Sequence, residues 1–392
     1  MRRMAAILTL QALFGLVAIA AASNGPDLPS PAAQLGRRLF SDPRLSASGR
    51  MACASCHDPA HAYASPPHAP AVMRGGPQLD RAGLRTVPSL RYLSETPRFA
   101  RHSYRDLGRE REDVGPAGGF MRDGRVDSLH EQALLPLLDP AEMANESLEA
   151  LSARLREIGY APALAEAFPD TDSSDLAQLA ARALERFELE DPSFRPYDSR
   201  FDRYLAGADT LSADELEGLR LFLEPTKGNC AACHAAITGP GGRAPDFTDH
   251  SFHALGVPRN PDIAANADRA FFDLGLCGPR RRDLRGETRY CGYFKTPTLR
   301  NVARRRAFFH NGRFTQLEDA VRFYAERDTH PERWYPVVAG RVHKFDDLPA
   351  RFVANVNVSD APLNRERGDA PALDAREIAQ LVAFLRTLND AE

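Results

Sequence analysis

Two short cysteine–histidine segments carry the clearest chemistry in this chain. Both have the pattern C-x-x-C-H: the residues are Cys53, Cys56 and His57 in the first, and Cys230, Cys233 and His234 in the second. The thiols of this motif form thioethers with haem vinyl groups, and the adjacent imidazole reaches the iron. A redox dithiol or half of a zinc site is the alternative for a single copy. Two copies, without a further C-x-x-C or paired histidines nearby, predict two covalently bound haem c groups.

The first residues read as an export signal. Arg2 and Arg3 precede an apolar run from Ala5 to Ala22 that ends in small residues, which predicts a signal peptide over residues 1–22. An uncleaved anchor helix is the alternative, but the run is near the short end for a bilayer span. We therefore expect a periplasmic protein with no membrane span after cleavage. The formal charge of −3 does not suggest a nucleic-acid partner.

The remaining two cysteines lie outside the haem motifs. Cys277 and Cys291 bracket an arginine-rich stretch. An even pair in an oxidising compartment predicts a disulfide that closes a surface loop. Two free thiols are the alternative. The arginines suit either an acidic partner or haem propionates.

The surroundings of the two haem motifs are repeated. The repeated pairs are LGRRLF (35–40) with EGLRLF (217–222), VPSLRY (87–92) with TPTLRN (296–301), and FMRDGRVDSLHEQALLP (120–136) with FHNGRFTQLEDAVRFY (309–324). Each half of the chain thus carries the same landmarks in the same order. This predicts two haem domains, 28–200 and 209–392, joined by a proline-containing linker near 190–208.

Helical periodicity dominates around these landmarks. Ser128 with Glu131 and Thr315 with Glu318 fit capping boxes. An apolar face with helical spacing follows Thr315 and ends at Tyr324. Further helices are expected over 147–160, over 174–190 and after Asp374, with long loops over 65–83 and 239–266. Strand patterns are few. The expected fold is mainly α, with two cytochrome c-like haem domains in tandem and loops over the haem edges.

Methionine, the usual partner of a high-potential haem, is missing from the second half. None of the six methionines lies after position 143. The second iron must therefore take another sixth ligand or none. The candidates are His250, His253, His310, His330, His343 and the tyrosines.

The chain resembles the bacterial di-haem cytochrome c peroxidase family, including its relative MauG, which matures a tryptophan-derived cofactor on another protein. The resemblance rests on both C-x-x-C-H motifs and on the segments DGRVDSLHEQALLPLLDPAEM, KTPTLRNVA and FFHNGRFTQLEDAV. In that family the helix after the H-[ND]-G turn supplies the sixth ligand of the second haem, methionine in ordinary peroxidases and tyrosine in MauG. Tyr324 stands at that position, so the resemblance implies a haem ligated by His234 and Tyr324. It gives His310 a supporting role.

The same alignment distinguishes the first haem from the second. Pro136 falls opposite Tyr324, and proline cannot ligate iron, so the haem of His57 is expected to leave a face open to peroxide. The family places a glutamine and a glutamate on that face, and Gln132 and Glu142 match them. Glu142 would move the peroxide proton and Gln132 would hold the leaving hydroxide. The resting sixth ligand is either His68 or none.

Two positions depart from the family pattern. Arg122 stands where a tryptophan is usual between the haems, and the only tryptophan is Trp334. A guanidinium cannot be oxidised as an indole can, which puts fast charge sharing in doubt. The family also holds a calcium ion between the domains, partly through an asparagine. Tyr92 stands at that place, so the calcium site is left open.

These features predict a periplasmic di-haem peroxidase. It would reduce hydrogen peroxide with electrons from a small cytochrome c or a cupredoxin. MauG-like oxidation of a protein substrate is the competing activity, which the tyrosine favours and the missing tryptophan weakens. A di-haem electron carrier without peroxidase activity is the third alternative. The oligomeric state is not predicted.

Overall fold

The computed structural model describes residues 28–106, 111–172 and 174–391. The expected signal peptide at 1–22 lies outside the described residues. Helices dominate the described ranges and the strands are short, which agrees with a mainly helical fold. Within these ranges no helix is long and apolar enough to cross a bilayer.

The first half of the chain folds around a long central helix, α5. Its helices are α1 (Pro31–Phe40), α2 (Leu129–Leu138), α3 (Leu148–Glu157), α4 (Ala161–Ala167) and α5 (Leu176–Glu190). The helices expected over 147–160 and 174–190 are confirmed by α3 and α5. Helices α1 and α2 pack on α5. Gly36 lets α1 approach closely, because a Cβ there would lie 1.9 Å from the carbonyl oxygen of Ala183.

The second half repeats this arrangement. Its helices are α6 (Arg200–Leu205), α7 (Ala213–Leu223), α8 (Leu317–Glu326) and α9 (Ala375–Arg386). Asp374 and Glu377 form the capping box that begins α9. Helix α7 packs on α9, and a Cβ at Gly218 would lie 2.1 Å from the carbonyl oxygen of Gln380. Gly36 and Gly218 are equivalent in the repeated LGRRLF and EGLRLF segments, so close helix contact explains this landmark.

The strands form four two-stranded antiparallel sheets within the described residues. They are β1 (Arg74–Gly75) with β2 (Arg81–Ala82), β3 (Ala100–Asp106) with β4 (Arg111–Ala117), β5 (Phe252–His253) with β6 (Phe294–Lys295), and β7 (Val337–Val338) with β8 (Arg341–Val342). The β3–β4 hairpin was not predicted from the sequence. Its residues are largely charged and carry no alternating apolar pattern of the kind that marks a half-buried strand.

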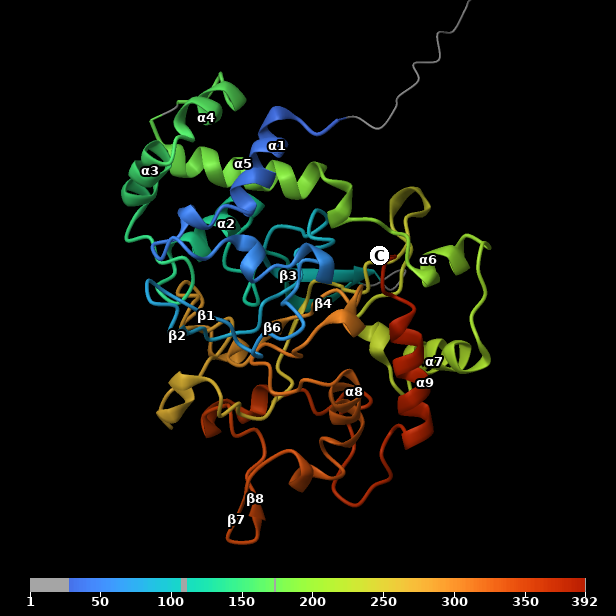
Figure 1. Cartoon of the computed structure of the whole chain (residues 1–392). Helices are drawn as coiled ribbons and strands as arrows, with labels where there is room; N and C mark the ends of the chain where they lie inside the picture. The colour runs from blue at the N-terminus through green and yellow to red at the C-terminus, as the bar shows by residue number, and fades with distance from the viewer. Residues whose placement is uncertain (1–27, 107–110, 173, 392) are drawn as a thin grey trace, which may run out of the picture.

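Two separate hydrophobic cores divide the molecule into two lobes. The first core draws on residues from Leu35 to Phe194, and the second draws on residues from Phe201 to Leu388. We call these the first and second lobes. Figure 1 shows α1–α5 gathered at one end and α7–α9 at the other, with the C-terminus between them. The VPSLRY and TPTLRN segments and the DGR and NGR turns lie where the lobes meet.

The landmarks of each lobe bond to those of the other. The backbone N–H of Thr86 donates to the carbonyl oxygen of His310 at 2.9 Å, and that of Lys295 donates to the carbonyl oxygen of Arg122 at 2.9 Å. Thr86 and Lys295 are equivalent in the repeat, as are Arg122 and His310. The two bonds are therefore the same contact made in opposite directions. This exchange places Arg122 of the first lobe in the wall of a cavity that is otherwise lined by the second lobe.

Candidate haem sites

The second C-x-x-C-H motif opens onto a cavity of about 210 Å³. Cys230, Cys233 and His234 form part of its wall, and Tyr324 of α8 forms another part. Helix α9 contributes Leu381 and Leu385. The motif begins in a single 3-10 turn over Cys230–Ala232, which places both thiols and the imidazole together.

Backbone carbonyls orient His234. Its Nδ1 lies 3.2 Å from the carbonyl oxygen of Phe247 and 3.1 Å from that of Pro297. Donation to these oxygens leaves Nε2 free to bind a metal. Burial lowers the pKa of His234 to about 4, so the imidazole is neutral, as ligation requires. Pro297 belongs to the TPTLRN landmark, whose conformation therefore determines how this ring is held.

Helix α8 presents Tyr324 to the same cavity. The helix begins at Leu317 with Gln316 as the N-cap and with no side-chain cap bond, so the predicted capping box of Thr315 and Glu318 is wrong. Acidic residues in its first turn, Glu318 and Asp319, favour the helix terminus through the macrodipole instead. Burial raises the pKa of the Tyr324 phenol, and the Cys233 and Cys230 thiols add to this.

Three cations in the cavity wall have no carboxylate partner among the described residues, and they supply a test of whether this cavity fits haem. They are Arg122, Lys295 and Arg305. Burial lowers the pKa of Arg122 to about 9, of Lys295 to about 7 and of Arg305 to about 10. The buried Nε atoms of Arg122 and Arg305 also lack hydrogen-bond acceptors. Buried cations need anionic partners, and haem propionates would provide them, so the wall fits haem.

Two of the histidines proposed as ligands also line this cavity. One is His253, whose Nε2 lies 2.8 Å from the Ser251 hydroxyl. The other is His310, whose ring stacks on that of Phe294 at 3.5 Å between centroids. The other three candidates, His250, His330 and His343, are not in the cavity wall. Among the candidates, the tyrosine on α8 and these two histidines are therefore the ones placed near His234.

The first motif is built in the same way around His57. Its Nδ1 lies 3.1 Å from the carbonyl oxygen of Tyr63, and the backbone of Pro88 also contacts it. Pro88 and Pro297 are equivalent in the repeat. Burial lowers the pKa of His57 to about 4, and it raises the pKa of the Cys53 and Cys56 thiols to about 12. Both histidines are thus neutral and held through Nδ1.

The opposing helix differs between the lobes. Helix α2 carries Gln132 and Pro136 one turn apart, and Gln132 is buried. Glu142 follows in a turn in which the N–H of Gly76 donates to its carbonyl oxygen at 2.8 Å. Burial, with help from Asp139, raises the pKa of Glu142 to about 7. Glu142 is close enough to Cys56 to raise the pKa of that thiol, so the structure brings Glu142 to the first motif.

A second acid near the first motif was not predicted. Glu188 of α5 is buried, and its Oε2 has no hydrogen-bond partner. Burial raises its pKa to about 8, and Glu188 in turn raises the pKa of the Cys53 thiol. The sequence offered one signal, since Glu188 follows directly after the inward-facing Phe187 on a helix whose buried face is otherwise apolar. His68, the candidate resting ligand, is exposed in a turn.

Cys277 and Cys291 form a disulfide, with their Cα atoms 4.9 Å apart. Part of the arginine stretch between them is used inside the molecule. The Arg281 guanidinium is buried, donates to the carbonyl oxygens of Asp123 and Gly124, and lies 3.8 Å from the Phe99 ring centroid. This arginine therefore ties the disulfide loop to the DGR landmark of the first lobe.

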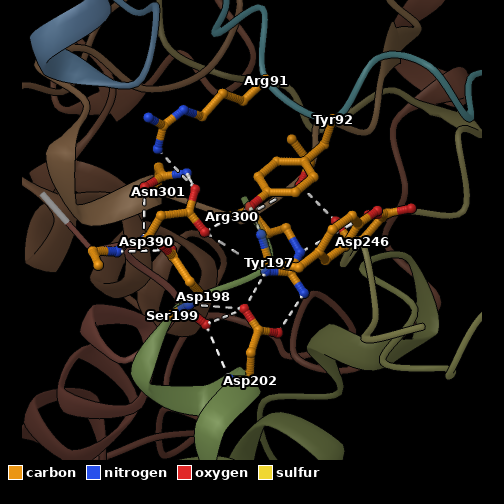
Figure 2. A network of polar contacts seen from close by, with 12 residues as sticks. Arg91, Tyr92, Tyr197, Asp198, Ser199, Asp202, Asp246, Arg300, Asn301 and Asp390 are labelled. Atoms are coloured by element: carbon orange, nitrogen blue, oxygen red, sulfur yellow. Dashed lines mark hydrogen bonds and ion pairs between the residues drawn. The ribbon is translucent and has the colours of Figure 1, made fainter. Parts of the chain in front are cut away.

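The place that the resemblance gives to calcium is filled by a guanidinium. Arg300 is buried between the rings of Tyr92 and Tyr197, at 4.8 and 4.6 Å from their centroids, and donates to both carboxylate oxygens of Asp202. The Tyr92 hydroxyl donates to Asp390 at 2.6 Å. Figure 2 shows these groups facing one another. No group of three or more His, Cys, Asp or Glu side chains that could hold a metal ion occurs in the described ranges.

The fold and the two motifs define a mainly helical protein with two similar lobes, each of which carries one C-x-x-C-H motif. The model of the di-haem cytochrome c peroxidase family matches residues 30–210. The chain is 32% identical over 372 residues to the methylamine utilization protein MauG of Paracoccus denitrificans, covering 91% of this chain and 88% of that protein. It is 29% identical over 305 residues to the cytochrome c551 peroxidase of Pseudomonas aeruginosa, covering 76% and 72%.

Solved structures agree with these relatives. The diheme peroxidase BthA of Burkholderia thailandensis superposes with a TM-score of 0.81 at 40% identity, covering 93% of this chain and 87% of that one. A variant of BthA in which a tyrosine is replaced by methionine gives a TM-score of 0.82 at 39% identity, with the same coverage. The chain therefore belongs to the di-haem cytochrome c peroxidase family, which includes MauG. It is an oxidoreductase of that family, and haem is its cofactor.

Proposed function

We propose that this protein is a periplasmic peroxidase that reduces hydrogen peroxide at the haem of His57. The observation that carries the proposal is the difference between two equivalent helices. Helix α8 presents Tyr324 to the cavity of the second motif, whereas α2 has Pro136 at the equivalent position. One haem would thus be ligated on both faces, by His234 and Tyr324, and the other on one face only.

The residues of the first site suit the reduction of peroxide. The haem supplies an iron that binds peroxide and can give up electrons to it. Glu142, with a pKa of about 7, can take the proton of the inner oxygen and return it to the outer oxygen. The Gln132 amide can donate a hydrogen bond to the leaving hydroxide. Cys53, Cys56, Cys230 and Cys233 would attach the two haems through thioethers.

The second site suits the storage and delivery of oxidising equivalents. An anionic oxygen ligand stabilises oxidised iron, which makes Tyr324 a different choice from methionine. The buried cations Arg122, Lys295 and Arg305 would neutralise propionates, and His310, stacked on Phe294, would support the haem. Electrons would come from a small cytochrome c or a cupredoxin.

MauG-like oxidation of a partner protein is the second candidate function. It is favoured by the 32% identity to MauG over most of both chains and by Tyr324. The residue between the two sites argues for peroxide reduction instead, because Arg122 cannot carry a hole. Whether turnover needs a protein substrate distinguishes the two functions.

Low-temperature EPR of the ferric holoprotein tests the ligand assignment. We expect one high-spin and one low-spin signal, and Tyr324→Met should change only the low-spin signal. His253→Gln, which alters another residue of the same cavity wall, should change neither signal. Two low-spin signals that do not respond to Tyr324→Met would refute both the open first site and the tyrosine ligand. Peroxide consumption with a reduced donor separates a peroxidase from an electron carrier.

A further inference from the structure

The only tryptophan of the chain lies beside the helix of the proposed tyrosine ligand. Trp334 follows α8 by a few residues, and its ring is half-buried. It contacts the Phe323 ring at 5.8 Å and the Phe314 ring at 5.7 Å between centroids. These contacts make it part of the second core, yet it also reaches the surface.

Both phenylalanines lead to Tyr324. Phe323 lies 6.3 Å from Tyr324 between ring centroids. Phe314 lies 5.4 Å from Phe309, which in turn lies 5.6 Å from Tyr324. Two continuous series of ring contacts thus connect the half-buried indole with the phenol that faces the cavity. Dense packing without gaps is the condition under which electrons pass most readily through a protein interior.

The surroundings of the indole suit a one-electron change. Its Nε1 is buried and has no hydrogen-bond acceptor, so an oxidised indole would keep its proton and could be reduced again without proton transfer. The Arg333 guanidinium lies 5.6 Å from the ring centroid, but it is paired with the Glu326 carboxylate. The opposite charges of this pair offset one another near the ring.

We propose that Trp334 is an electron relay between an external donor and the haem site of Tyr324. The inference rests on the proposed function, which supplies the oxidant, hydrogen peroxide. If position 334 served packing alone, phenylalanine would suit it equally well, as it does at the neighbouring positions Phe314 and Phe323. Indole is the most easily oxidised of the core side chains, which gives the tryptophan a role that phenylalanine cannot fill.

The electrons and protons of this step balance. Each peroxide takes two electrons and two protons and yields two water molecules. Trp334 gives one electron at a time to the oxidised haem site, becomes a cation radical, and regains an electron from the donor. No bond in the indole is made or broken. The protons are taken up at the first site, where Glu142 lies.

Trp334→Phe in the full-length holoprotein tests the relay. When one equivalent of hydrogen peroxide is added, stopped-flow spectroscopy should show that the haems of the variant are oxidised at the wild-type rate. Its return to the resting state with ferrocyanide or with a reduced small cytochrome c should be slower by an order of magnitude. Freeze-quench EPR should show an organic radical in the wild type that the variant lacks. Tyr335→Phe, a neighbouring buried aromatic that packs on Phe345, serves as the control and should behave as wild type.

The outcomes separate the relay from the function on which it rests. Equal rates of reduction in wild type and Trp334→Phe, with normal peroxide consumption, would overturn the relay alone. A radical that persists in Trp334→Phe would do the same. A wild-type holoprotein that does not react with peroxide would overturn both proposals. Unchanged resting EPR spectra show that the substitution has left both haem sites intact.

Discussion

At the scale of single residues, the two sites share a framework and differ in a few side chains. His57 and His234 are held by carbonyls of equivalent segments, including those of Pro88 and Pro297. The difference lies opposite them, where one lobe has Tyr324 and the other has Pro136. In the proposed function, this one difference gives the two haems different coordination, and with it a division of labour.

The reaction with peroxide should depend on the ionisation of Glu142. Its pKa of about 7 means that the carboxylate, which accepts the proton, is the minor form at low pH. The rate of oxidation by peroxide should therefore rise as the pH passes through about 7 and then level off. Glu142→Gln should lose this dependence and react about 10²–10⁴-fold more slowly. Stopped-flow measurements across this pH range provide the test.

Glu146→Gln is the matched control for this experiment. Glu146 is an exposed acid just beyond the same turn. Its replacement should leave both the rate and the pH profile unchanged. A wild-type profile that is flat between pH 5 and 9, or a Glu142→Gln variant as fast as wild type, would remove Glu142 from the reaction.

At the scale of helices and strands, periodicity predicted what depends on local sequence. The spans of α3, α5 and α9 follow from their apolar spacing, and Asp374 caps α9 as expected. The start of α8 was missed by one residue, since Gln316 and not Thr315 is the N-cap. Fully buried Phe323 shows the reason, since this helix is packed against Phe309, Phe314 and Trp334 on a second face. Tertiary packing, and not the cap, decides where it begins.

Contacts between the lobes could not be predicted from the sequence. The repeat shows that Thr86 is equivalent to Lys295, and Arg122 to His310, but not that each pairs with the other lobe. Glu188 illustrates the same limit, because it lies beside Leu90 and Leu129, which come close to it only in the folded chain. Local patterns identified the residues, whereas non-local packing set their environments.

Helix α5 should be destabilised by its buried acid. The folded-state pKa of Glu188 is raised from 4.5 to about 8, so the folded protein keeps a proton that the unfolded chain releases between these values. Stability therefore falls as the pH rises through this window. The Glu188→Gln variant has no ionisable group at this position, so it does not lose this stability as the pH rises. Its Tm should be close to wild type at pH 4.5 and progressively higher than wild type towards pH 8, as measured by differential scanning calorimetry.

The exposed Glu166 of α4 provides the comparison, and Glu166→Gln should show no such pH-dependent gain. A Glu188→Gln variant that is less stable than wild type at pH 8 would mean that the carboxylate has a stabilising partner in the holoprotein. It would also give Glu188 a role at the first haem site.

At the scale of the whole molecule, the lobes are joined by equivalent segments that converge on the C-terminus. Arg91 and Tyr92 of the first lobe and Asn301 of the second all bond to the Asp390 carboxylate, at 2.8, 2.6 and 2.6 Å. Arg91 is equivalent to Arg300 and Tyr92 to Asn301 in the repeat. One carboxylate thus joins both copies of the landmark, and the Arg300 guanidinium lies beside it (Figure 2).

This junction predicts a protein whose lobes are held together without calcium. EDTA should leave the Tm and the peroxide reaction of the holoprotein unchanged, because guanidinium groups already balance the junction carboxylates. Asp390→Asn should lower the stability by about 3–5 kcal/mol, since it leaves buried arginines without their counter-charge. It should also speed proteolysis in the segment between Glu190 and Ala208. Asp369 is an exposed acid in the loop that precedes α9, and Asp369→Asn should have neither effect. A fall in Tm on adding EDTA, restored by Ca²⁺ alone, would show that a metal and not Arg300 closes this junction.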